Sequence, residues 1–113
     1  MEDKIVRGST WSVRFKFKPE QLAVRNIKDI YLAVTQGPNK SIEFLDGTGG
    51  NHWTLDEYEN TATYHFSQED TLALRPGIRV YLECHVLDIF GERSEAFGGT
   101  YLVKDTEYPE VMT

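Results

Sequence analysis

The sequence predicts an all-β protein, and three observations support this prediction. Apolar and polar residues alternate through several segments, most clearly from Ile78 to Asp88, as they do in β-strands with one buried face. Turn-forming residues separate these segments at about the spacing of eight to twelve residues that is typical of β-sandwiches. No segment has the length and period of a helix that could link parallel strands. We therefore expect an immunoglobulin-like β-sandwich of seven to eight strands with one short helical turn.

The expected strands share one property: each alternates in polarity, or is a short apolar run, and ends at turn-forming residues. In chain order they are Ile5–Val6, Trp11–Phe17, Lys28–Gln36, Ser41–Leu45, His52–Leu55, Thr61–Phe66, Ile78–Asp88 and Arg93–Val103. Together they form one domain over residues 1–104, followed by a C-terminal tail over residues 105–113.

The connections between these strands have distinct compositions. Residues 18–26 include a proline and have room for one helical turn. Residues 37–40 read Gly-Pro-Asn-Lys and predict a hairpin turn, as does the polar stretch 56–60. Residues 46–51 are too rich in glycine for regular structure.

A short helix is expected after Ser67. This serine, with Asp70 three residues later, has the pattern of a helix N-cap, and the helix would continue through Leu74 until Pro76 and Gly77 end it.

The expected core consists of the residues on the apolar side of the alternating strands, with one leucine from the helix. They are Trp11, Val13, Phe15, Phe17, Ile30, Leu32, Val34, Tyr64, Phe66, Leu72, Val80, Leu82, Cys84 and Val86.

Composition excludes several classes of protein. The net charge of −6 argues against binding nucleic acid, because affinity for a phosphate backbone comes from lysine and arginine. The first residues, MEDKIVRGS, contain no apolar segment of a signal peptide, and no run has the length of a membrane span, so we expect no membrane partner. The single cysteine, Cys84, lies on the apolar side of its strand and is interpreted as a core residue rather than a reactive thiol.

No catalytic or metal-binding constellation is evident. The histidines His52, His65 and His85 lie on three expected strands, without the spacings that bring metal ligands together. The acidic stretch 56–59 lacks the DxDxDG pattern of a calcium loop, and no GxSxG sequence places a serine beside a base. We therefore expect neither an enzyme nor a bound cofactor or metal.

Aromatic residues offer one candidate binding surface. Trp53 and Tyr58, with Trp11, are candidates for a platform on which a sugar ring stacks. Trp11 is in register with core positions and is expected to be buried, whereas the position of Trp53 is left open.

The order of the sequence motifs resembles a known group of proteins. RGST, IKDIYLAVTQG, SIEFLDG, TATYHFSQEDTLAL, PGIRVYLECHVLDIFGERSEA and TYLVKDTEYPEVM follow one another over almost the whole chain. This order is similar to that of small proteins encoded in phages and prophages of Gram-positive bacteria, and it looks like the N-terminal β-sandwich of phage baseplate upper proteins. The resemblance implies a structural component of the virion, found there or in the host cytoplasm during assembly.

Two functions of different classes therefore remain. The preferred one is a non-enzymatic tail or baseplate protein, whose partners are other virion proteins or further copies of itself. The alternative is a carbohydrate-binding or cell-surface recognition module that uses Trp53 and Tyr58.

The tail has two interpretations. Its residues Tyr108, Val111 and Met112 are apolar groups near the end of the chain, and termini are usually disordered unless something holds them. They either dock on a neighbouring protein or fold back onto the sandwich.

Overall fold

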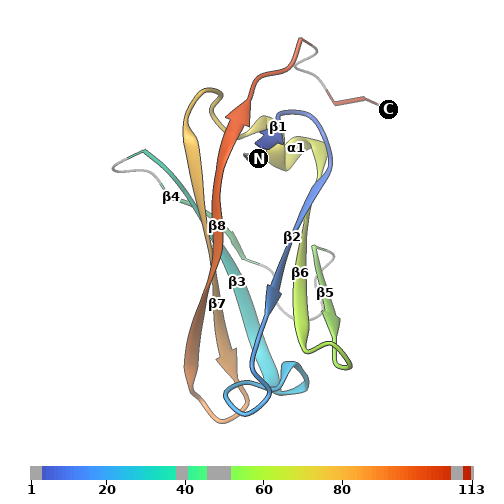
Figure 1. The fold of residues 1–113 in the computed structure, drawn as a ribbon, viewed down its shortest axis with the longest axis vertical. Coiled ribbons are helices and arrows are strands. Elements are labelled where there is room, and N and C mark those ends of the chain that lie inside the picture. Colours follow the sequence, from blue (N-terminus) through green and yellow to red (C-terminus); the bar gives the residue numbers. More distant parts are fainter. Residues whose placement is uncertain (1–3, 38–40, 46–51, 108–110, 113) are drawn as a thin grey trace.

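The protein is built from two β-sheets that face each other across one core (Figure 1). The computed structural model describes residues 4–37, 41–45, 52–107 and 111–112, with the backbone alone for residues 41–45. The described strands and helices, in chain order, are β1 (Lys4–Val6), β2 (Trp11–Lys16), η1 (Val24–Asn26), β3 (Ile27–Gln36), β4 (Ser41–Leu45), β5 (Trp53–Asp56), β6 (Thr61–Phe66), α1 (Gln68–Leu72), β7 (Arg79–Asp88) and β8 (Arg93–Lys104).

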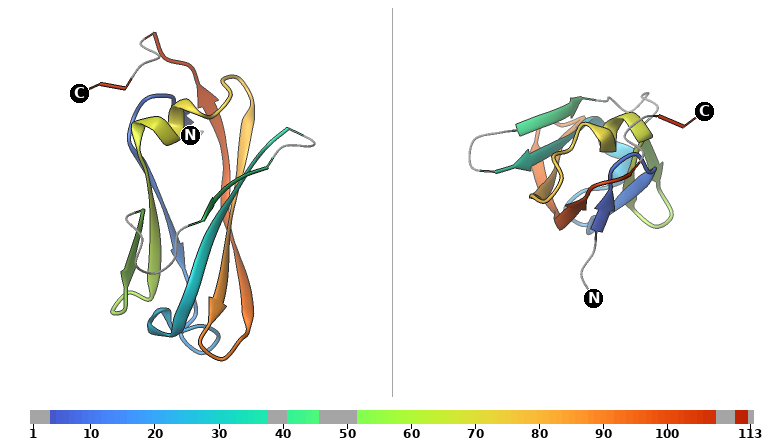
Figure 2. Two further views of the ribbon diagram at one scale, coloured as in Figure 1. Left: turned by 180° about the vertical axis from the view of Figure 1, so that it is seen from behind. Right: turned by 90° about the horizontal axis from the view of Figure 1, so that it is seen from above.

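In the described part of the chain, the larger sheet has five strands and the smaller sheet has three. The larger sheet has the order β1-β8-β7-β3-β4, and the smaller has the order β2-β6-β5. All pairs are antiparallel except β1 with β8, which is parallel. Figure 2 shows the two layers from behind and from above, with α1 at one end of the molecule. The all-β prediction is confirmed, and the expected strands are found within one or two residues of their predicted limits.

The core forms because each sheet turns its apolar side chains toward the other. Leu32 of β3 and Leu82 of β7 are fully buried, and they face Phe15 and Tyr64 of the smaller sheet. Most of the residues expected in the core are buried. Additional buried side chains come from segments without long alternation, such as Leu22 in the connection before η1.

Two expected core positions need correction. Leu72 is only partly buried, because α1 ends there and the chain turns so that Leu74 enters the core instead, with 1% of its surface exposed. Trp11 is also partly buried. It packs against the edge of the core, where its ring contacts Phe66 and Tyr101.

Helix α1 confirms the predicted cap. The Ser67 hydroxyl accepts a hydrogen bond from the Asp70 backbone N–H at 3.2 Å, and the Asp70 carboxylate accepts one from the Ser67 N–H at 3.0 Å. The Thr71 hydroxyl then donates to the Ser9 carbonyl at 2.7 Å and joins the helix to the turn between β1 and β2. Within the described ranges, no helix is long and apolar enough to cross a membrane.

Asn60 lies in the predicted hairpin turn 56–60, and its side chain connects three segments at the opposite end of the molecule. Its side chain is 7% exposed and accepts a hydrogen bond from the Val24 N–H at 2.8 Å. Its amide group donates to the carbonyls of Phe17 and Leu22, at 2.8 and 2.9 Å. The backbone of Asn60 has a φ of 56°, a conformation that asparagine tolerates better than most residues. One buried side chain therefore ties the β5–β6 turn to the connection between β2 and β3.

Substitution of Asn60 tests this interpretation. Asn60→Gly keeps the backbone conformation but removes three side-chain hydrogen bonds, and it should lower the free energy of unfolding by about 1 to 3 kcal/mol. Asn60→Ala should cost roughly 1 kcal/mol more, because of its positive φ. Urea unfolding measures both, with the exposed neighbour Glu59→Ala as the control. An unchanged urea midpoint for Asn60→Gly would show that the buried amide does not hold the turn.

Candidate functional site

The outer face of the larger sheet carries the candidate site. In β7 the inward side chains of Leu82 and Cys84 are fully buried, so the residues between and beside them face solvent. Tyr81, Glu83 and His85 occupy these outward positions. Because β7 pairs with β8 on one side and β3 on the other, its backbone holds these side chains on a rigid support.

A β-bulge in β8 adds an aromatic ring to this face. Leu82 pairs with Gly99 and Glu83 pairs with Phe97, so Gly98 is an extra residue in the ladder. The bulge reverses the alternation of β8, and Phe97 points outward while Tyr101 points to the core. A Cβ atom at residue 98 would lie 2.6 Å from the Phe15 ring, which explains why the bulged residue is glycine.

Tyr81 and Phe97 form an exposed aromatic pair. Their ring centroids are 4.8 Å apart with an interplanar angle of 38°, and 43% and 59% of their surfaces are exposed. Because the two exposed rings are in contact, they form a contiguous apolar surface, which is a feature of interaction sites. We call Tyr81 and Phe97 the aromatic patch.

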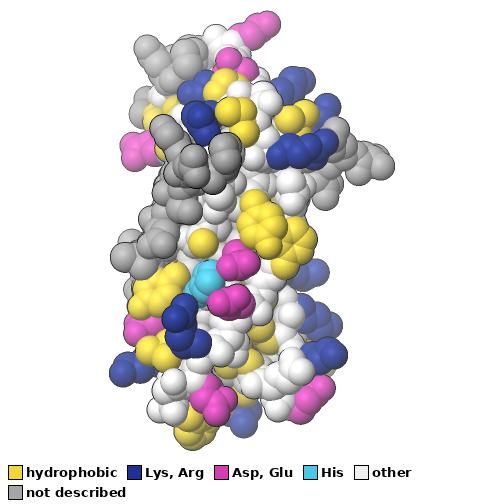
Figure 3. Space-filling model, turned by 90° about the vertical axis from the view of Figure 1, so that its left-hand side faces the viewer, with side chains coloured by type: hydrophobic (Ala, Val, Ile, Leu, Met, Phe, Trp, Pro, Cys, Tyr) yellow, Lys and Arg dark blue, Asp and Glu magenta, His cyan; other side chains and the backbone are white. Residues whose placement is uncertain are grey.

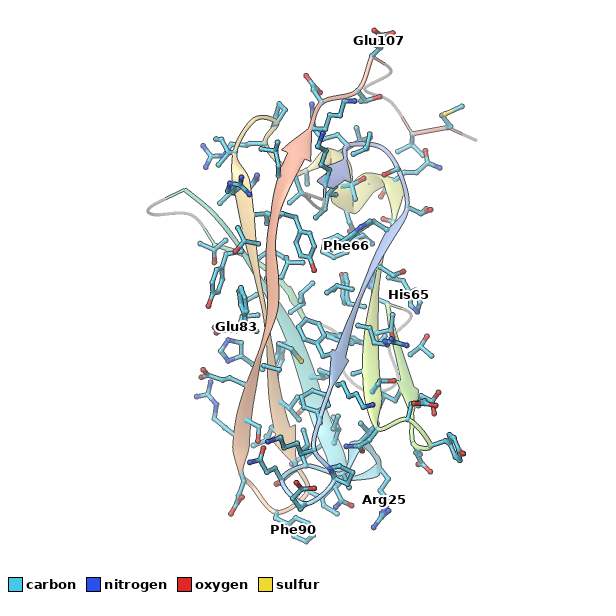
Figure 4. The ribbon with its side chains drawn as sticks, in the orientation of Figure 1. Arg25, His65, Phe66, Glu83, Phe90 and Glu107 are labelled. Atoms are coloured by element: carbon cyan, nitrogen blue, oxygen red, sulfur yellow. The ribbon has the colours of Figure 1, made fainter. Side chains whose placement is uncertain are left out.

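A charged group lies directly beside the aromatic patch. His85 lies between two carboxylates, with Nε2 2.6 Å from Glu83 Oε1 and Nδ1 3.6 Å from Glu95 Oε1. Glu95 pairs with His85 across the β7–β8 ladder, and Glu83 is two residues away on the same strand. Figure 3 shows the histidine and acidic side chains next to one another on this face, with large hydrophobic side chains beside them. In Figure 4, Glu83 lies on the side of its sheet that faces away from the smaller sheet.

A second polar group lies on the smaller sheet and has a different character. The His65 ring bonds the Ser12 hydroxyl through Nδ1 at 2.9 Å and the Thr54 hydroxyl through Nε2 at 2.8 Å. A serine beside a histidine is one requirement of nucleophilic catalysis, but a third group that orients the histidine as a base is also required. Here a threonine hydroxyl occupies that place. We interpret the group as a hydrogen-bonded link across β2, β6 and β5.

The structure separates the residues that the sequence suggested as an aromatic platform. Trp53 pairs with Tyr64 on the inward side of the smaller sheet, is 7% exposed and contacts the Phe15 ring. Tyr58 lies on the β5–β6 turn with 94% of its surface exposed. The candidate platform of Trp53 and Tyr58 with Trp11 is therefore not formed, because the indole ring of Trp53 is buried and cannot stack on a sugar.

The tail residues have mixed positions. Met112 exchanges two hydrogen bonds with Gln68 of α1: its N–H donates to the side-chain oxygen at 2.6 Å, and its carbonyl accepts from the side-chain nitrogen at 3.0 Å. This contact agrees with the interpretation in which the tail folds back. The side chains of Val111 and Met112 nevertheless remain exposed, and Tyr108 lies outside the described residues.

Sequence reasoning missed the aromatic patch and the group around His85. The signal for part of it was present, because Tyr81, Glu83 and His85 alternate with the apolar residues of β7. Phe97 and Glu95 could not be added to them, since their positions depend on the register and the bulge between β7 and β8.

Cys84 provides a test of the inward face of β7. Burial raises the pKa of its thiol to about 12, so the reactive thiolate is scarce at neutral pH. We expect iodoacetamide at about pH 8 to leave the folded protein unmodified and to modify it rapidly in urea, as measured by mass spectrometry. Equal rates of modification in both conditions would contradict the inward orientation of this face.

Comparison of the chain with models of known protein families gives no match, and no curated protein matches it.

Proposed function

We propose that this chain is a non-enzymatic structural protein of a phage or prophage tail or baseplate, which acts by binding other virion proteins or further copies of itself. The observation that carries this proposal is the aromatic patch, Tyr81 and Phe97, on the broad outer face of the larger sheet. The virion assignment rests on the resemblance of the sequence motifs described above.

The patch has properties that protein interfaces use. Aromatic side chains are enriched in such interfaces because they bury much apolar surface with little loss of conformational freedom. Both rings stand on paired strands rather than on loops, so a partner would meet a preformed surface. The adjacent polar side chains of Glu83, His85 and Glu95 provide a rim that limits indiscriminate aggregation.

Sheet edges offer a second kind of contact. The outermost strands are β1 and β4 in the larger sheet and β2 and β5 in the smaller. An edge strand has backbone groups available to pair with another chain, which suits a protein that works in a symmetric assembly.

We also propose that the sandwich is immunoglobulin-like in topology. The order β2-β6-β5 corresponds to strands B-E-D of that fold, and β4-β3-β7-β8 corresponds to strands C′-C-F-G. Three features support this reading: the strand order, the antiparallel pairing within these two sets, and a core between the sheets.

A genetic experiment tests the function. In a strain that carries the gene, phage release is induced, the particles are purified and an antibody detects the chain. We expect the chain in the particles, and we expect loss of infectious particles when the gene is deleted. Absence of the chain from particles, together with an unchanged titre after deletion, would refute the proposal.

The same strain tests the aromatic patch. The double substitution Tyr81→Ser and Phe97→Ser should reduce the titre toward that of the deletion, because it removes the apolar contact while leaving the core unchanged. Tyr58→Ser removes another exposed aromatic ring and should leave the titre unchanged. Thermal melts of the purified variants confirm that both are folded. Equal titres for the folded double variant and the Tyr58 variant would place the contact elsewhere.

A further inference from the structure

Three side chains with metal-binding atoms converge on the outer face of the larger sheet. Glu83, His85 and Glu95 each offer one ligand atom, and these atoms lie within 4.8 Å of one another. Among the residues that the structure describes, they are the one group of three or more histidine, cysteine or carboxylate side chains with this property.

Strand pairing fixes the backbone positions of the three residues with ligand atoms. Glu83 and His85 project from the same face of β7, and Glu95 is the direct partner of His85 on β8. Ladder hydrogen bonds hold Glu83 and His85 on both sides because β7 lies inside the sheet, and the pairing of β8 with β7 holds Glu95. Only side-chain rotations are therefore needed to bring the three donor atoms around one ion.

The charges of the group favour a cation. The ion pairs of Glu83 and Glu95 are with His85, and within the described residues neither carboxylate has an ion pair with lysine or arginine. A divalent ion beside the two carboxylates would offset both of their negative charges. The ion would also leave the imidazole neutral, which is the form that binds metals.

We propose that Glu83, His85 and Glu95 form a binding site for a divalent transition-metal ion of the Zn²⁺ type. His85 Nε2 and Glu83 Oε1 lie 2.6 Å apart, so these two donor atoms are already close to the place that the ion would take. One imidazole nitrogen and two carboxylate oxygens are ligands that Zn²⁺ accepts, at about 2.0 to 2.2 Å each. Ca²⁺ and Mg²⁺ prefer sites made of oxygen alone.

The site is open on its solvent side. Glu95 is the most exposed of the three ligands, with 59% of its side chain accessible, and water completes the coordination of the ion. The inward neighbour Cys84 contributes nothing, because its side chain is fully buried on the opposite face of β7. This proposal reverses the sequence-based expectation that no metal is bound, since that expectation considered the three histidines separately from the carboxylates.

Calorimetric titration of the full chain with ZnCl₂, after removal of metal with EDTA, tests the site. We expect one Zn²⁺ per chain, with affinity reduced about tenfold or more by Glu83→Gln, by Glu95→Gln and by His85→Ala. The two glutamine variants keep the size of the side chain. The matched control is His65→Ala, which removes a strand histidine whose partners are hydroxyl groups, and it should bind like the wild type.

A second measurement identifies the ligand directly. Long-range ¹H–¹⁵N NMR spectra of the histidine rings should show that Zn²⁺ shifts a ring nitrogen of His85 while those of His52 and His65 keep their positions. MgCl₂ should cause no shift. The proposal is overturned if the wild type binds no Zn²⁺, if folded His85→Ala binds it as tightly as the wild type, or if the shifted nitrogen belongs to another histidine.

Discussion

The structure depends on the position of β7 inside the larger sheet. Its neighbours β8 and β3 pair with it along nearly its whole length, and its inward side chains at residues 80, 82, 84 and 86 are almost completely buried. The strand cannot slip by one residue, because the slip would move all of these side chains into solvent. The same constraint fixes Tyr81, Glu83 and His85 on the outside. The core and the candidate site are therefore two consequences of one alternating strand.

Two local features depart from the regular strand pairing: the bulge at Gly98 and the buried side chain of Asn60. The bulge at Gly98 turns Phe97 outward to meet Tyr81, and it allows β8 to lie against the Phe15 ring. The Asn60 side chain adds three hydrogen bonds to the backbone bond between the Phe17 N–H and the Asn60 carbonyl, where the connection 18–26 crosses the end of the sandwich. The bulge leaves one residue in the middle of β8 outside the ladder, and Asn60 lies directly before β6 begins.

The all-β class and the limits of the strands were predictable from the sequence, because period-two alternation identifies a half-buried strand without knowledge of its partners. The cap at Ser67 was predictable for a similar reason, since its hydrogen bonds join residues three positions apart. Trp53 and Leu72 show the limit of this reasoning. Trp53 lies on a strand of four residues, which is too short for its alternation to show which side is buried. The burial of Leu72 depends on where the five-residue helix α1 ends.

The candidate site was less predictable because it depends on contacts between strands. The approach of Glu95 to His85 requires the register of β7 and β8, and the position of Phe97 requires the bulge. Neither leaves a periodic signal in one strand. The burial of Asn60 likewise arises from a connection that is distant in sequence and close in space.

Oxidative footprinting with hydroxyl radicals tests the proposal that this chain binds its partners in a phage particle through the outer face of β7 and β8. The measurement compares side-chain oxidation in the isolated chain and in purified phage particles. We expect Tyr81 and Phe97 to be oxidised readily in the isolated chain and to be protected in the particle, while Tyr58 reacts equally in both. Equal oxidation of Tyr81 and Phe97 in both states, with protection confined to Tyr58 or to the tail at Met112, would contradict the account.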